Sequence, residues 1–222
     1  MEKKINTIEH YNLLASLFSY PDEKLRIDFE AVHKLLESKY ISASQFFNEF
    51  YLFSKSISLF KWQEIYTRTF DVQAITTLDL GYVLFGDDYK RGELLVNLSR
   101  EHKKFDNDCG SELGDHLPNV LRLLTKLTDD DLKIDLIYLI IKPALHKISA
   151  EFDLDKIDQK NSVYKKHQDT LIEPANNFGL IYQQLLMALI DVLQEDFPDS
   201  KFKFDNGKTF TKEITNEIEI ES

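Results

Sequence analysis

Apolar residues recur at helical spacing along almost the whole chain, and this periodicity constrains the fold more than any other feature. Ile8, Tyr11, Ala15 and Phe18 lie three or four residues apart, so they share one face of a helix. Similar patterns follow with little interruption, and the 222 residues include only 7 Gly and 5 Pro. Because a turn-dense β-fold needs more of both, we expect an all-α fold, a single-domain bundle of roughly nine to eleven helices.

Capping residues and a proline indicate where the early helices begin and end. Pro21 ends the first helix, Asp22 opens the second, and Ser42 is expected to cap the third. A short apolar helix over residues 77–85 stops at Gly86. The side chains expected to form an apolar stripe in the core on the third helix are Phe46, Phe50, Phe53 and Ile57. A fourth helix is expected around Trp62, Ile65, Tyr66 and Phe70, and Asp87 or Asp88 is expected to cap the helix that buries Leu94, Leu95 and Leu98.

The second half of the chain continues the helical pattern after a polar loop at residues 103–114. Asp115 is expected to cap the next helix, with Pro118 in its first turn. The carboxylates of residues 129–131 complement another helix start, and Pro143 should kink or split the helix that follows. The last two expected helices cover residues 162–172 and 178–197. We expect residues 1–197 to form one helical domain and residues 198–222 to form a loose, acidic polar tail.

The formal net charge of −11 favours some classes of partner over others. A strongly acidic protein repels nucleic-acid phosphates, so we expect no nucleic-acid binding. A partner with basic segments fits better, although the same charge also keeps a protein soluble without any role in binding.

Cysteine usage and the lengths of the apolar runs indicate a cytoplasmic protein. Cys109 is the single cysteine, so no intrachain disulfide can form, and a reducing compartment is expected. No apolar stretch follows the basic residues near Met1, as a signal peptide would require. The most apolar runs, residues 136–141 and 185–190, are too short to span a bilayer. We therefore expect no membrane insertion.

Residue patterns that carry enzyme chemistry are largely missing. Residues 106–117 begin like a calcium loop but have Ser111 where that loop needs Gly. His102, Cys109 and His116 are evenly spaced, but no closely spaced ligand pair supports a zinc site. The aspartates near Cys109 would raise the pKa of its thiol, which argues against a nucleophile. We expect no enzyme activity, no metal and no cofactor.

Three stretches stand out for their order and spacing. The first is LLASLFSYP at residues 13–21. The second comprises YTRTFD at 66–71, TTLDLGYVLFGD at 76–87, Arg91-Gly92 and LLVNL at 94–98. The third is ELGDHLPNVL at 112–121. Together they resemble the nitrate reductase molybdenum cofactor assembly chaperones, which form the NarJ branch of the TorD-like redox-enzyme maturation proteins.

The resemblance implies a helical, non-catalytic chaperone for a respiratory molybdoenzyme. Such chaperones bind the N-terminal peptide of the molybdenum-containing catalytic subunit. They hold the subunit in the cytoplasm while its iron–sulfur and molybdenum cofactors are inserted, before it attaches to its membrane partner. The resemblance also allows contacts with cofactor-delivery proteins. A groove between helices with an acidic rim would suit an amphipathic, basic client segment.

The candidate client-binding residues are Glu112, Asp115, His116, Tyr82, Phe85 and Arg91. Each also has a purely structural interpretation. Asp115 can serve only as an N-cap, His116 can bond a neighbouring loop carbonyl, and Glu112 can be a solvated carboxylate. Arg91 can pair with Asp87 or Asp88 one turn away.

The remaining two candidates lie on the short apolar helix. Tyr82 and Phe85 can be core residues, and Gly81 beside them indicates a close approach between helices. Two other functions stay open on the sequence alone. One is an acidic helical adaptor with no link to metalloenzymes, and the other is a helical enzyme such as a small hydrolase or a metal-dependent oxygenase.

Overall fold

The all-α architecture expected from the periodicity is confirmed. The computed structural model describes residues 8–157, 160 and 180–201, and this part contains ten α-helices and no β-strand. In chain order the elements are α1 (His10–Ser16), α2 (Glu23–Lys39), α3 (Ile41–Ser56), α4 (Leu59–Phe70), α5 (Leu80–Phe85), α6 (Tyr89–Lys104), α7 (Leu117–Lys126), α8 (Asp130–Asp135), the π-helical turn η1 (Leu136–Ile141), α9 (Lys142–Ala150), α11 (Leu180–Asp196) and the 3-10 turn η3 (Asp199–Lys201).

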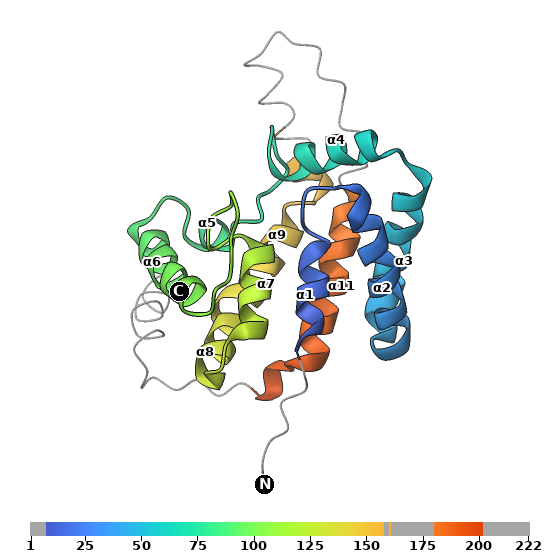
Figure 1. Ribbon diagram of the computed structural model, residues 1–222. Coiled ribbons are helices and arrows are strands. Elements are labelled where there is room, and N and C mark those ends of the chain that lie inside the picture. The colour runs from blue at the N-terminus through green and yellow to red at the C-terminus, as the bar shows by residue number, and fades with distance from the viewer. Residues whose placement is uncertain (1–7, 158–159, 161–179, 202–222) are drawn as a thin grey trace.

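The helices are arranged around a central pair, α1 and α11 (Figure 1). On one side α2 and α3 pack against each other and against this pair, and on the other side α7 packs on α1 while α9 packs on α11. The short helix α5 contacts both α9 and α6, and α6 lies at the outer edge. The last helix of the described chain is therefore enclosed by elements from both halves of the sequence.

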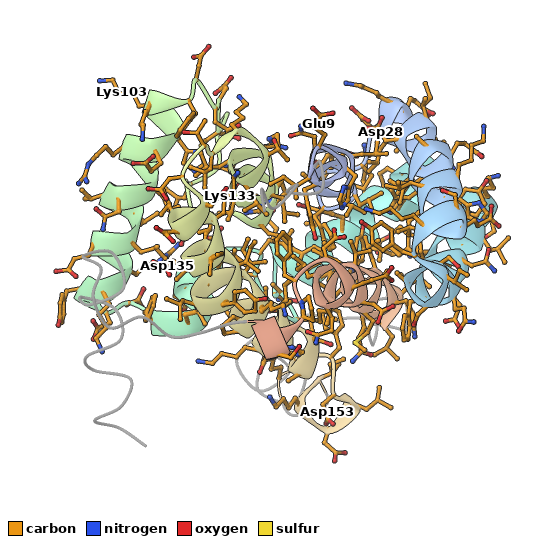
Figure 2. All side chains as sticks on the ribbon, turned by 90° about the horizontal axis from the view of Figure 1, so that it is seen from below. Glu9, Asp28, Lys103, Lys133, Asp135 and Asp153 are labelled. Carbon is orange, nitrogen blue, oxygen red and sulfur yellow. The ribbon has the colours of Figure 1, made fainter. Side chains whose placement is uncertain are left out.

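Aromatic side chains fill the junction of α3, α4 and α11. The indole Nε1 of Trp62 donates a hydrogen bond to the hydroxyl of Tyr182 at 2.9 Å, and both residues are buried. The Tyr182 ring meets those of Phe50, Tyr66 and Phe70 edge-on, with centroids 5.0 to 5.9 Å apart. Such edge-on pairs stabilise a core beyond the area that they bury. Side chains fill the interior between the helices, while exposed Lys103 and Asp153 lie on the outside (Figure 2).

Three of the expected helix starts are confirmed. The carboxylates of Asp22, Asp88 and Asp129 accept hydrogen bonds from backbone amides in the first turns of α2, α6 and α8. The expected Ser42 cap is wrong, because α3 begins at Ile41 directly after the buried Tyr40.

The aromatic face of the third helix is rotated by about one residue from the expected stripe. Phe47 and Phe50 are buried, whereas Phe46 and Phe53 are only half-buried. The reason lies in the packing of α3 against α2 and α11. Phe47 and Phe50 both pack edge-on against Phe29 of α2, and Phe50 also meets Tyr182 of α11, so the face of α3 that contains these two residues turns inward.

The disturbance expected at Pro143 takes the form of the π-helical turn η1. The backbone amide of Lys142 bonds the carbonyl of Ile137, five residues back. A helix that continues through proline must accommodate its missing N–H and its ring, and a wider turn does so without breaking the chain direction. The helix therefore resumes as α9, and Ile140 and Ile141 stay buried.

Polar and charged side chains connect the end of α11 and the residues after it to η1 and α9. Lys142 is 8% exposed, and its ammonium donates to Gln194 Oε1 at 2.9 Å and to Asp199 Oδ1 at 2.6 Å. Tyr138 donates to the carbonyl of Pro198 at 3.0 Å. The described body thus continues to residue 201, four residues into the segment expected to be a tail.

Three parts of the expected pattern lie outside the described residues. They are the helix expected at residues 162–172, the first two residues of the helix expected at 178–197, and residues 202–222 of the expected tail. Among the helices that the structure describes, none combines the length and the apolar character needed to cross a lipid bilayer.

Candidate functional site

Two of the three family-like stretches pair directly with each other. The backbone amide of Leu80 bonds the carbonyl of Asp115 at 2.9 Å, and that of Leu117 bonds the carbonyl of Leu78 at 2.9 Å. These two bonds make an isolated antiparallel bridge between Asp79 and His116. The start of α5 and the start of α7 are thereby held side by side, with their polar side chains between them.

Arg91 reaches this bridge from α6 and makes two ion pairs. Its Nε donates to Oδ2 of Asp115 at 3.1 Å, and its Nη2 donates to Oδ2 of Asp79 at 3.1 Å. Burial lowers the pKa of Arg91, but the hydrogen bonds and charges of the two carboxylates outweigh burial, and the net pKa is raised. Arg91 therefore pairs with Asp79 and Asp115 and not with Asp87 or Asp88, the partners that its structural interpretation suggested.

Asp115 is fully buried, with 0% exposure, and it does not cap α7. The residue at the cap position is His116, whose side chain bonds no backbone amide of that helix. The expected capping role is therefore wrong, because the carboxylate of Asp115 faces Arg91. Its other oxygen, Oδ1, has no hydrogen-bond partner among the described residues. Such a carboxylate depends strongly on its one cation.

Gly81 lets α5 approach this pair closely, as expected from its place in an apolar helix. A Cβ at this position would lie 2.7 Å from Oδ2 of Asp115, 3.0 Å from Cδ2 of Leu94 and 3.2 Å from Cγ of Arg91. Any larger residue would have to displace the ion pair, so glycine here permits the contact between α5 and α6.

His116 bonds a carboxylate instead of the expected loop carbonyl. Its Nδ1 lies 3.1 Å from Oδ1 of Asp79, so Nδ1 carries the hydrogen. This hydrogen bond is the largest cause of the lowered pKa of Asp79, followed by a smaller opposing effect of burial and by the charges of His116 and Arg91. The His116 ring is thereby fixed at the start of α7.

Beside this cluster lies a cleft of about 520 Å³ between the start of α7, the end of α4 and the loops around them. Its lining residues are Ser19, Tyr20, Tyr66, Phe70, Asp71, Thr77, Asp79, Cys109, Glu112, His116, Pro118, Asn119 and Arg122. Asp71 and Glu112 are exposed, whereas His116 and Arg122 are half-buried. The pKa of Tyr66 is raised, mainly by burial and then by the charges of Glu112, Asp71 and Asp79, which indicates a negative potential.

One wall of the cleft is held rigidly by amide side chains. Nδ2 of Asn119 donates to the carbonyls of Leu113 at 2.9 Å and Cys109 at 3.3 Å, and its Oδ1 accepts from Nη2 of Arg122 at 2.5 Å. Asn107 in turn donates to the carbonyl of Asn119 at 3.1 Å. The polar loop between α6 and α7 is thus tied to the first turn of α7.

His102 is part of the same support and is not arranged as a zinc ligand. Its Nε2 donates to the carbonyl of Gly114 at 2.9 Å, and its Nδ1 accepts from Nδ2 of Asn107 at 2.9 Å. Burial lowers the pKa of His102, so its ring is neutral near pH 7. Within the described part of the chain, no group of three His, Cys, Asp or Glu residues is placed to hold a metal ion.

The six candidate residues do not share one cleft. Glu112 and His116 line the cleft described above, and Asp115 lies buried beside it. Tyr82 is 43% exposed and lines a second cavity of about 680 Å³, which shares Phe70, Asp71 and Thr77 with the first. Phe85 is half-buried and packs against the core.

Two residues that complete the site were missing from the candidates, namely Asp79 and Arg122. Asp79 stands in the TTLDLG stretch, so its place in that motif could have indicated a role. Arg122 lies just beyond the third stretch, one turn after Pro118, and no pattern in the sequence distinguishes it from other helical arginines.

No protein-family model matches the chain, and no curated protein matches it significantly. The function is therefore inferred from the geometry of the cleft and from the resemblance of the three stretches.

Proposed function

We propose that this protein is a NarJ-type chaperone that binds the N-terminal segment of a molybdoenzyme catalytic subunit, similar to nitrate reductase. It would hold that segment in the cytoplasm during cofactor insertion and act without catalysis of its own. The observation that carries the proposal is the convergence of all three family-like stretches on one cleft, which Tyr20, Tyr66, Asp79, Glu112 and His116 line.

The surroundings of the cleft favour a peptide as the ligand. Exposed apolar side chains lie at or next to its lining, with Tyr20 55%, Val72 56% and Leu113 49% exposed. Apolar surface beside a polar cleft is typical of sites that bind protein segments. A cavity of about 520 Å³ accommodates a few side chains of such a segment, not a whole folded partner.

The charges of the cleft favour a segment with basic residues. Asp71 and Glu112 are exposed carboxylates at the cleft, and the whole chain has a net charge of −11. Such a field attracts a basic segment and speeds its encounter with the protein.

Calorimetry with a peptide from the N-terminus of the molybdoenzyme subunit tests this proposal. Ordering a flexible peptide offsets part of the interaction energy, so we expect a dissociation constant near micromolar, about −8 kcal/mol. A scrambled peptide should bind much more weakly. Equal binding of both peptides would contradict the proposal and leave only nonspecific apolar adsorption.

A pair of matched variants locates the binding site. His116→Gln removes a ring that lines the cleft, and His146→Gln makes the same change at an exposed position of α9 outside both cavities. We expect the first variant to weaken peptide binding and the second to leave it unchanged. Equal affinities in both would place the peptide elsewhere on the protein.

An acidic helical adaptor with no metalloenzyme client is the second candidate, because the same cleft and the same net charge would serve it. Affinity purification from the native cell followed by mass spectrometry separates the two functions. A maturation chaperone should bring down its molybdoenzyme subunit, whereas an adaptor should bring down partners unrelated to molybdenum.

A further inference from the structure

We propose that Arg122 recognises a carboxylate of the bound segment, an Asp or Glu side chain that lies next to a basic residue. This inference rests on the proposed function, since it names which feature of the client the cleft selects. It starts from the contrast between two arginines near the Asp79–His116 bridge, of which one is fully paired and the other is not.

Arg122 is a half-buried cation without an ion pair in the described part of the chain. Among the described residues, its guanidinium forms one hydrogen bond, to the neutral Oδ1 of Asn119. Arg91, by comparison, is 17% exposed at its side chain and bonds two carboxylates. Removing a charge from water without a counter-charge is unfavourable, and such groups concentrate at binding sites. Burial lowers the pKa of Arg122, and the smaller opposing effects of Cys109 and Asp108 do not offset it.

The guanidinium is positioned for a ligand. Asn119 is itself fixed by the carbonyls of Cys109 and Leu113, and its Oδ1 holds one Nη of Arg122. A guanidinium has five N–H donors in a rigid fork that matches the two oxygens of a carboxylate. Only one of these nitrogens is engaged by Asn119, and the side chain lines the cleft, so an entering carboxylate can bond the others.

The other charges of the cleft select the class of anion. Asp71, Asp79 and Glu112 line the same space, and Asp108 lies close enough to affect the pKa of Arg122. A multiply charged phosphate would be repelled by these groups. A single carboxylate flanked by a basic residue is not, because its cation would meet exposed Asp71 or Glu112 while its anion meets Arg122. The cleft therefore fits a peptide with adjacent opposite charges.

The test uses the full-length protein and the N-terminal peptide of the molybdoenzyme subunit, with each Asp or Glu of that peptide changed in turn to Asn or Gln. Arg122→Gln should weaken binding by about ten- to a hundredfold, as expected for a lost charge-assisted hydrogen bond. One amide-substituted peptide should lose a similar factor with the wild-type protein. That peptide should bind Arg122→Gln no more weakly than the unmodified peptide does, because the two changes remove the same contact.

Arg100→Gln on the exposed face of α6 is the matched control and should leave affinity unchanged. Unfolding of Arg122→Gln by urea, in parallel, shows whether the variant is folded. If the variant is unfolded, Arg122→Lys replaces it, since lysine keeps the charge but loses the fork, and a loss of affinity of at least threefold is then expected.

The outcomes separate the inference from the proposed function. If the peptide binds the wild type and Arg122→Gln equally, the inference is overturned and the proposed function stands. If Arg122→Gln loses affinity but no amide-substituted peptide does, Arg122 binds a backbone carbonyl and the carboxylate assignment is overturned. If the peptide does not bind the wild type at all, both are overturned.

Discussion

Arg91 and Arg122 are two half-buried cations near the same bridge between α5 and α7, and they differ in their partners. Arg91 bonds Asp79 and the fully buried Asp115, each at 3.1 Å. Arg122 bonds a neutral amide and forms no ion pair among the described residues. The first arrangement holds three segments of the chain together. The second leaves a positioned charge in the cleft, and we propose that a carboxylate of the bound segment pairs with it.

Removal of Arg91 should have the largest effect on stability. In Arg91→Met, the carboxylate of Asp115 stays buried without a cation, so we expect a loss of about 3–5 kcal/mol in the free energy of unfolding. Urea denaturation measures this loss. Arg68→Met, which breaks the exposed pair with Glu64, is the control and should lose at most about 1 kcal/mol. Equal small losses in both variants would show that the buried cluster contributes no more than a surface pair.

Asp115→Asn distinguishes the ion pair from the capping role suggested by the sequence. Asn and Asp are comparable N-caps, so a capping residue would tolerate the change. Because Asp115 instead pairs with Arg91, we expect a loss of about 1.5–3 kcal/mol, the range for a hydrogen bond to a charged group. The readout is the urea midpoint of the variant against that of the wild type. Unchanged stability would argue that the carboxylate is dispensable.

Two glycine-to-alanine substitutions with opposite expected effects on stability test the packing around this pair. In Gly81→Ala the new Cβ would lie 2.7 Å from Asp115 Oδ2, so we expect a loss of about 1–3 kcal/mol from overpacking. Gly92 on α6 has open space, and Gly92→Ala should gain about 0.5–1 kcal/mol through its better helix propensity. Thermal unfolding of both variants gives the two signs. A stabilised Gly81→Ala would mean that α5 and Asp115 are not in contact.

The acid side of the stability profile should depend on Asp79. The hydrogen bond from His116 is the first cause of its lowered pKa in the folded protein. Its contribution to stability is therefore fully present above the unfolded pKa of about 3.9 and is lost as the pH falls through the lower folded value. Asp79→Asn should flatten the pH dependence of the unfolding free energy below about pH 4. An identical slope in variant and wild type would contradict the role of the carboxylate.

The fold can be predicted from the sequence where interactions between neighbouring residues determine the local structure. The prediction fails where contacts with distant parts of the chain determine it. Helix type follows from apolar spacing, and the caps Asp22, Asp88 and Asp129 follow from bonds to amides within three residues. Ser42 and Asp115 satisfy the same local rule, yet neither caps a helix. At Ser42 the helix has already begun, directly after the buried Tyr40, and the carboxylate of Asp115 pairs with the guanidinium of Arg91.

The candidate site shows the same division. Glu112 and His116 could be identified as site residues from the sequence because they belong to the third family-like stretch, residues 112–121. The partners of Arg91 lie 12 and 24 residues away, so a one-turn pairing rule cannot identify them. Arg122 carries no sequence signal, because what distinguishes it is a half-buried side chain without an ion pair among the described residues, and only the folded arrangement shows this.

The most direct test of the difference between the two arginines is the unfolding free energy of Arg122→Gln without any ligand, measured by urea denaturation beside Arg91→Met. We expect Arg122→Gln to stay within about 1 kcal/mol of the wild type, because the lost hydrogen bond to Asn119 is offset by relief of an uncompensated charge. A loss as large as that of Arg91→Met would contradict this expectation. It would mean that Arg122 is a structural residue whose charge is already balanced within the folded protein.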